Sequence, residues 1–328
     1  SSRLPGKRHI GGSAEQTAGC CGERNAADVN GILCMDKPQE FTSFDVIGKL
    51  RGILHLKRLG HTGTLDPMAT GVLPVLVGTA TKACDILPNQ DKTYRAEVQF
   101  GYETDTQDRW GKTVQTFPEM QVTRAQLEAV LPAFIGSIEQ IPPMYSAVSV
   151  GGQRLYDLAR KGVEVERPAR TVVIHAISLD AFDEAEQTAV LTVSCGKGTY
   201  IRTLLSDIGH ALDGGAVLTE LRRTMACGYR LEQAYTFEQV AQMMQEGTLE
   251  AHLIPTETLF AALPALHLGE AQARMYRNGV KLDLKRLRQV RTDAAQYRVY
   301  DAQGKFLGTA QADWEQGLLR VGKNFGTG

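Results

Sequence analysis

The sequence predicts an α+β protein of two domains, and three observations support this fold class. First, two runs alternate apolar and polar residues as half-buried strands do, KTYRAEVQFG at 92–101 and TAVLTVSC at 188–195. Second, segments with helical spacing lie between and after these runs. Third, the sequence pattern changes from about Leu266 onward, and the run RVYDAQGKFLGTA in this region is typical of a hairpin. A chain of 328 residues with 43% hydrophobic content can fill two moderate cores.

Ordered structure is expected to begin near Asn30. Residues 1–29 contain few large apolar side chains, and we expect them to form a mobile extension without chemistry. The run GILCMDKP then indicates a strand that ends at Pro38. A helix should follow, because Thr42 and Asp45 can form a capping box and the next apolar residues share one face: Val46, Ile47, Leu50, Ile53 and Leu54.

The stretch RLGHTGTLDPMATG, at 58–71, is poorly suited to a helix or a core. Its three glycines add backbone freedom, and Pro67 disfavours the helical region for the residue before it. Asp66 is therefore expected on a shaped loop. A lone aspartate there can act as a nucleophile, a base or a turn residue, and the turn role is the commonest of the three.

Two further segments after this loop have clear patterns. GVLPVLVGTATKACDIL should form a buried strand or turn and then a short helix, and VTRAQLEAVLPAFIG a helix capped by Thr123. In the strand at 92–101, Tyr94 shares the inward face with Ala96, Val98 and Phe100. That pattern alone favours a core tyrosine with a satisfied hydroxyl.

Two segments have local features that suit RNA. From about 140 to 170, tyrosines are interleaved with arginine and lysine, as in a surface that stacks on bases and contacts phosphates. The run KLDLKRLRQVR, at 281–291, is the strongest local excess of positive charge. Solvated surface is the alternative for both segments, but so marked an excess of charge at 281–291 in a near-neutral protein fits a contact with a polyanion.

TAVLTVSCGKGTYIRTLLSDIGHAL predicts a strand, a glycine turn and a helix whose first turn contains Tyr200 and Arg202. An arginine there opposes the helix dipole, so a nearby anion would explain it, and a surface arginine is the alternative. The following LTELRRTMACGYRLEQ predicts a strand that contains Leu221, Arg222 and Arg223.

Composition excludes several classes of protein. The formal net charge is −1, so any contact with a polyanion must be local. The six cysteines form no C-x-x-C pair and no zinc-type cluster with histidine, and His61 and Asp66 have no third ligand near in sequence. No apolar run is long enough to span a membrane, no P-loop is present, and a cytoplasmic location is the default expectation.

Five blocks, in order, resemble the bacterial tRNA pseudouridine-55 synthases of the TruB family. The resemblance runs from about Asn30 almost to the C-terminus, and the block GHTGTLDPMATG is highly specific. The blocks are GILCMDKPQEFTSFDVI, RLGHTGTLDPMATGVLPVLVGTATK, DKTYRAEVQFGYETDTQD, IPPMYSAVSVGGQRLYDLARKG, and CGKGTYIRTLLSDIG with LRRTMACGY.

The resemblance implies a pseudouridine synthase fold, with a central mixed, largely antiparallel sheet flanked by helices and a small β-rich, PUA-like C-terminal domain. The implied boundaries are a catalytic domain over 30–254, an RNA-binding insertion at about 140–170 and an RNA-binding C-terminal domain over 255–328. The implied activity is that of a monomeric isomerase that converts uridine 55 in the T loop of tRNA to pseudouridine. Contact with the T arm is implied, and neither a metal nor an organic cofactor is required.

The resemblance also assigns roles to residues. Asp66 matches the catalytic aspartate, which must reach a base taken out of the stack. Arg202 matches the arginine that pairs with it, and a cation within about 4–6 Å favours the ionised carboxylate. Tyr94 matches the tyrosine that stacks on the target base and assists proton removal from C5. Tyr200 and Leu221 match residues that line the pocket, and His61 one that meets the remodelled T loop as a stacking surrogate.

Two other functions fit parts of the sequence. A tRNA-binding or RNA-folding protein would explain the basic, aromatic insertion and the basic run, and it would not need Asp66, Tyr94 and Arg202 together. An aspartate-dependent hydrolase of a small substrate would turn over without RNA, and it would leave both basic segments unexplained.

Overall fold

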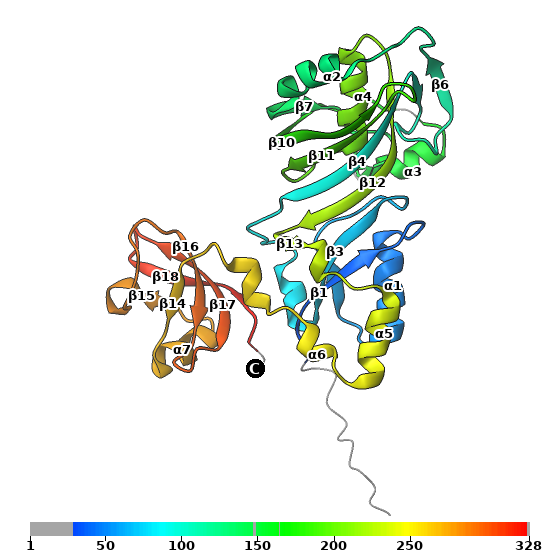
Figure 1. The fold of residues 1–328 in the computed structure, drawn as a ribbon. Helices are drawn as coiled ribbons and strands as arrows, with labels where there is room; N and C mark the ends of the chain where they lie inside the picture. Colours follow the sequence, from blue (N-terminus) through cyan, green and yellow to red (C-terminus); the bar gives the residue numbers. More distant parts are fainter. Residues whose placement is uncertain (1–28, 147–148, 164, 327–328) are drawn as a thin grey trace, which may run out of the picture.

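The computed structural model describes residues 29–146, 149–163 and 165–326. Except for Val29, the extension predicted over 1–29 lies outside the described residues. The described chain forms two units, each with its own sheet, and the smaller C-terminal unit projects from one side of the larger one (Figure 1). Among the described helices, none has the length and apolar character needed to cross a membrane.

The sheet of the larger unit has nine strands, and its main path runs β1-β3-β12-β4-β11-β10-β7. Only β3 and β12 pair in parallel, so the sheet is mixed and largely antiparallel, as the resemblance predicted. Its strands are β1 (Gly31–Lys37), β2 (Leu59–His61), β3 (Thr70–Val77), β4 (Lys92–Phe100), β7 (Gly136–Gln140), β10 (Arg170–Asp183), β11 (Thr188–Cys195), β12 (Ala216–Ala226) and β13 (Tyr229–Arg230).

Helices cover the sheet in two groups. One group packs on β1 and β3, and consists of α1 (Ser43–Leu54), α5 (Phe237–Glu246) and the short α6 (Leu249–His252). The other packs on β4, β11 and β12, and consists of α2 (Arg124–Val130) and α4 (Ile201–Ala211). The capping box of Thr42 and Asp45 at the start of α1 is confirmed, and so is the cap of α2 at Thr123. Both helices therefore begin where their local sequences predicted.

The alternation of β4 is also confirmed, since Tyr94, Ala96, Val98 and Phe100 are all buried. This strand lies between β12 and β11 in the middle of the sheet. Strands on both sides therefore fix the backbone of β4. At Tyr94 the paired residues are Val193 on β11 and Arg223 on β12.

Two segments between strands of the large sheet lie outside it. The hairpin of β5 (Tyr102–Thr104) and β6 (Thr113–Thr116) follows β4. The segment between β7 and β10 starts and ends at paired residues, because Gln140 lies opposite Arg170. It contains β8 (Ser149–Val150), β9 (Gln153–Arg154) and α3 (Leu155–Arg160). The segment predicted as an insertion is thus a loop between two adjacent antiparallel strands.

The C-terminal unit has a five-stranded sheet and a separate core that includes Tyr276 and Tyr297. The predicted hairpin at 298–310 is confirmed as β16 and β17. The elements are β14 (Ala265–His267), α7 (Glu270–Arg277), β15 (Leu282–Asp283), β16 (Gln296–Tyr300), β17 (Phe306–Asp313) and β18 (Leu318–Asn324).

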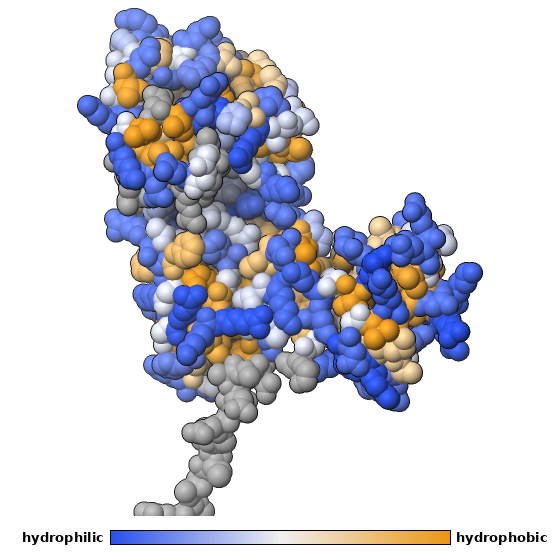
Figure 2. Space-filling view, turned by 180° about the vertical axis from the view of Figure 1, so that it is seen from behind, coloured by the Kyte–Doolittle hydropathy of each residue, from blue (hydrophilic) through white to orange (hydrophobic). Residues whose placement is uncertain are grey.

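Contacts along one edge join the two units. The Lys323 ammonium pairs with Asp85 at 2.9 Å, and Lys82 donates to the carbonyl oxygen of Asn324 at 2.6 Å. The cations of the basic run at 281–291 are exposed. Hydrophilic residues are prominent on the face that Figure 2 shows, over both units.

Candidate active site

The loop between β2 and β3 carries Asp66, and buried side chains from other elements bind its backbone. The Arg223 guanidinium, on β12, donates to the carbonyl oxygens of Gly63 at 3.2 Å and Thr64 at 3.3 Å. The Ser43 hydroxyl, at the start of α1, accepts from the backbone N–H of Leu65 at 3.0 Å. These contacts come from two different elements, so they fix the backbone that leads to Asp66.

Lys37 holds the other side of the same loop. Its side chain is fully buried at the end of β1, and the ammonium donates to the carbonyl oxygens of Phe41 at 2.6 Å, Pro38 at 2.9 Å and Pro67 at 3.0 Å. Burial lowers the pKa of Lys37 to about 8, and the nearby Asp66 carboxylate opposes that shift. Lys37 therefore serves the loop as a structural cation.

Arg223 and Gly71 meet where β12 and β3 run in parallel. Arg223 is fully buried and its Nε donates to the carbonyl oxygen of Val72 at 2.7 Å. Gly71 has a φ of +106°, and a Cβ built on it would lie 2.1 Å from the Arg223 carbonyl oxygen. Only glycine fits here, because a side chain would meet both backbone strain and a backbone clash.

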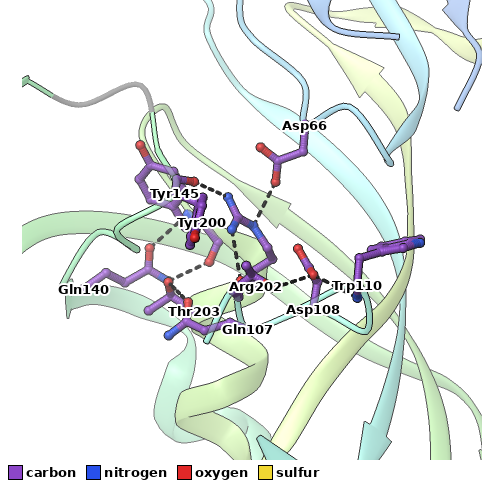
Figure 3. Close-up of polar contacts among 10 residues, drawn as sticks. Asp66, Gln107, Asp108, Trp110, Gln140, Tyr145, Tyr200, Arg202 and Thr203 are labelled. Atoms are coloured by element: carbon purple, nitrogen blue, oxygen red, sulfur yellow. Dashed lines mark hydrogen bonds and ion pairs between the residues drawn. The ribbon is translucent and has the colours of Figure 1, made fainter. Parts of the chain in front are cut away.

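Asp66 is paired with Arg202. The Arg202 Nε lies 2.9 Å from Asp66 Oδ2, an ion pair whose geometry is not that of a hydrogen bond (Figure 3). The guanidinium also donates to the carbonyl oxygens of Thr106 at 3.0 Å and Tyr145 at 2.9 Å. The Arg202 side chain is 5% exposed, whereas the Asp66 side chain is 43% exposed. A rigidly held cation thus faces a carboxylate that a substrate can reach, and the anion expected near Arg202 is Asp66.

A cavity of about 300 Å³ lies beside this pair. It is at the lower end of the volumes that small-molecule sites have. Five of the six residues assigned to the site from the sequence line it: Asp66, Tyr94, Tyr200, Arg202 and Leu221. They come from the loop, from β4 and β12, and from the beginning of α4. The fold therefore gathers into one wall residues that are far apart in the sequence.

His61 is not among the residues that line this cavity. It lies at the end of β2, where its ring meets the Phe44 ring edge-on at 5.9 Å. Its Nδ1 is buried without a hydrogen-bond partner in the described structure. Burial, with a smaller contribution from Arg223, lowers the pKa of His61, so its imidazole is neutral at neutral pH.

Tyr94 has the core position that its strand pattern favours, and it also lines the cavity, as the family resemblance implies. It is 6% exposed and belongs to the main hydrophobic core, yet it also lines the cavity. Burial raises the pKa of its phenol, and the positive charge of Arg223 opposes the shift. The hydroxyl therefore stays protonated at neutral pH.

Three residues with clear places in the site were not singled out from the sequence. Gln140 is buried, and its side-chain amide binds both backbone groups of Tyr200, accepting from N–H at 3.0 Å and donating to the carbonyl oxygen at 3.2 Å. Lys92 and Lys197 line the cavity. Lys92 could have been found, because it lies two residues before Tyr94 and therefore on the same face of β4.

Three family models match successive parts of the chain. They are the TruB family pseudouridylate synthase (N terminal domain) at 51–201, the tRNA pseudouridylate synthase B C-terminal domain at 202–261, and pseudouridine synthase II TruB, C-terminal, at 264–321. Among solved structures, a chain of a Cbf5-Nop10-Gar1 complex has a TM-score of 0.69 over 90% of this chain and 85% of that one, at 24% identity. The fold is thus that of the pseudouridine synthases, a class of isomerases.

Curated relatives define the family. A tRNA pseudouridine synthase B of Thiobacillus denitrificans is 44% identical over 87% of this chain and 93% of the relative. Relatives of the same name from Bacillus subtilis and Acaryochloris marina are 43% and 42% identical, over 78% and 86% of this chain and 84% and 94% of theirs. The chain belongs to the TruB family of pseudouridylate synthases.

Proposed function

We propose that this protein isomerises uridine 55 in the T loop of tRNA to pseudouridine, with Asp66 as the nucleophile and the target base flipped out of the stack. The observation that carries the proposal is the Asp66–Arg202 pair in the wall of a cavity that Tyr94 also lines. Relatives named tRNA pseudouridine synthase B, about 40–44% identical over most of the chain, support tRNA as the substrate.

The reaction breaks the bond between C1′ and N1 and joins the same uracil to the ribose through C5. Asp66 supplies the electron pair to C1′ or to C6. In the first case its bond to C1′ breaks as C5 bonds to C1′, and in the second it leaves C6 after that carbon–carbon bond has formed. One proton leaves C5 and one is gained at N1, so the product has the composition of the substrate. Because nothing is oxidised or reduced, the atoms balance without an added metal or organic cofactor.

Each side chain of the wall has a part in this scheme. Arg202 pairs with the Asp66 carboxylate and fixes its direction. The detached uracil must be retained while it turns, and Tyr94, Tyr200 and Leu221 close the cavity around it. Since the Tyr94 phenol stays protonated, we propose that its hydroxyl accepts the C5 proton only as its own proton passes to solvent water in the cavity. His61, outside the cavity, is proposed to stack against the rearranged T loop.

The remaining RNA contacts are assigned by position. The segment between Gln140 and Arg170 joins the site through the Tyr145 carbonyl oxygen, which Arg202 binds. We propose that this segment grips the T arm and that the C-terminal unit contacts more distant RNA. We also propose that the protein acts as a monomer in the cytoplasm, where its substrate is found.

The test is pseudouridine formation on unmodified tRNA, mapped by a carbodiimide-dependent stop in primer extension. We expect a stop that reports position 55 with the parent protein. Asp66→Asn should lower turnover by more than about 10³-fold and leave tRNA binding within a few fold, because the amide keeps the shape but is a poor nucleophile. Near-normal turnover by this variant would remove the nucleophile assignment. Tight tRNA binding without any pseudouridine from the parent would instead favour an RNA-binding or RNA-folding protein.

A further inference from the structure

Two lysines line the cavity in addition to the Asp66–Arg202 pair. Lys92 is on β4, and its ammonium donates to the carbonyl oxygen of Gln90 at 2.9 Å. Lys197 is exposed in the turn between β11 and α4. Among the described residues, neither lysine forms an ion pair with a carboxylate. The isomerisation scheme above uses neither of them.

The charges around the cavity do not balance. Among the described side chains that line it, the one carboxylate is Asp66, which pairs with Arg202. The cations Lys92 and Lys197 are additional. The Asp91 carboxylate acts on Lys92 from outside the cavity lining but is paired with His175 at 3.1 Å. Burial, followed by the positive charge of Arg223, lowers the pKa of Lys92. A partly buried ammonium beside another cation is costly unless an anion comes to it, and such an anion interacts more strongly there than in bulk water.

The positions of the two lysines suit the backbone of a flipped nucleotide. Lys92 and Tyr94 lie on the same face of β4, and the rise of a strand places their Cα atoms about 7 Å apart. One nucleotide spans a comparable distance from its base to its phosphate. On the other side, a Cβ built on Gly63 would lie 3.3 Å from Lys92 Cε, so Lys92 rests against the loop that carries Asp66.

We propose that Lys92 and Lys197 form a phosphate-binding site in this cavity, which holds the phosphates on either side of the flipped nucleotide and so places its ribose beside Asp66. The site deepens the proposed function and rests on it. Lys92 takes the inner phosphate, because it lies against the Asp66 loop, and Lys197 takes the next one, at the mouth of the cavity.

The test measures binding of a T-arm stem-loop RNA to the full-length Asp66→Asn protein, in which chemistry is suppressed. One RNA is unmodified, and two others have a neutral methylphosphonate in place of the phosphate 5′ or 3′ to the target uridine. Lys92→Met should weaken binding of the unmodified RNA by about tenfold. With one of the two methylphosphonate RNAs, Lys92→Met should weaken binding little beyond the loss that the methylphosphonate itself causes. The reason is that a lysine and a phosphate in contact give non-additive effects on binding when both are changed.

Lys197→Met should show the same coupling with the other methylphosphonate. Each lysine substitution should also lower the slope of log K against log salt by about 0.7, the value for one phosphate contact on a single strand. Lys92→Arg, which keeps the charge, should restore most of the binding. Lys49→Met, at an exposed lysine on α1 outside the cavity lining, is the control and should leave both quantities unchanged.

Additive effects of the lysine and methylphosphonate changes, with unchanged salt slopes, would overturn the phosphate site. If the melting temperature of Lys92→Met is well below that of the parent, Lys197 still tests the proposal. Lys197 is exposed, so its substitution can be combined with the methylphosphonate RNAs without loss of the fold. The site can fail while the proposed function stands, since the parent would still form pseudouridine. Absence of pseudouridine from the parent would remove the function itself.

Discussion

The loop that carries Asp66 and the segment between Gln140 and Arg170 both contribute to the site, but they are attached to the fold in different ways. The Asp66 loop is bound along its backbone by buried side chains of three other elements. In the described part of the 140–170 segment, Arg202 binds the Tyr145 carbonyl oxygen, and Arg167, near the end of the segment, donates to the carbonyl oxygen of Pro142 at 3.2 Å.

This difference corresponds to two requirements of the enzyme, bond making and RNA binding. Bond making needs a carboxylate held to a fraction of an ångström, and buried cations that bind loop carbonyl oxygens supply that rigidity. RNA binding needs charge and aromatic surface spread over many contacts, and each contact can be weak. Substitutions behind the Asp66 loop should therefore act on stability and turnover, and substitutions in the 140–170 segment on affinity.

The largest effect is expected from Arg223→Met. The substitution keeps much of the buried volume but leaves the carbonyl oxygens of Gly63, Thr64 and Val72 without their donor. Unsatisfied buried acceptors of this kind should lower the free energy of unfolding by roughly 2–5 kcal/mol. Urea unfolding measures the loss, and turnover should fall in conditions where the variant is still folded.

Arg222→Met is the matched control, one residue away on the opposite face of β12. Arg222 is partly exposed and pairs with Asp36 at 2.8 Å. A pair of this exposure contributes about 0–1 kcal/mol, so the variant should unfold close to the parent. Equal losses for the two variants would show that the Asp66 loop does not depend on the buried arginine.

A smaller effect is expected from neutralising Arg154, Arg160 and Lys161 together. Each lost phosphate contact lowers the salt slope of tRNA binding by roughly one, so three should weaken binding by about 30–100-fold at moderate salt. Turnover at saturating tRNA should change much less. Filter binding across a salt series checks the slope, and an unchanged slope would make the segment ordinary surface.

The sequence predicted the parts of the fold that depend on local chemistry. The capping box of α1, the cap of α2 at Thr123 and the alternation of β4 are local, and they were found where they were expected. The mixed, largely antiparallel sheet followed from the family resemblance, because strand order depends on contacts between distant segments. The hairpin of β5 and β6 was not predicted, since its fully exposed β6 lacks an apolar face.

The support of the Asp66 loop could not be predicted from the sequence. Arg223 reaches carbonyl oxygens 159 and 160 residues away, and Lys37 one 30 residues away. Every residue type has a backbone carbonyl group, so a contact with a carbonyl oxygen does not require a particular residue and gives no sequence motif. The strand pattern predicts only that Arg222 and Arg223 face opposite ways, and not which of the two is buried.

The smallest effect is expected from Tyr94→Phe, and it separates the two roles proposed for Tyr94, stacking and proton transfer. The ring should keep its stacking on the flipped uracil, worth roughly 1–3 kcal/mol per base, so tRNA binding should be unchanged. Release of the C5 proton should slow by roughly 10-fold, less than the 10²–10⁴-fold of a full general base, because the phenol stays protonated. Tritium release from C5-labelled tRNA in single-turnover conditions measures this step.

Tyr94→Leu is the companion variant, because it removes both the ring and the hydroxyl. It should lose stacking and slow proton release together, and thermal unfolding of both variants shows how much of either effect is lost stability. A purely structural Tyr94 gives another pattern: Phe is tolerated in turnover, Leu lowers the melting temperature, and neither acts on chemistry at constant stability. If Tyr94→Phe releases tritium at the parent rate, Tyr94 keeps only its stacking part. If Tyr94→Leu does so as well, Tyr94 has no place among the residues that hold the base.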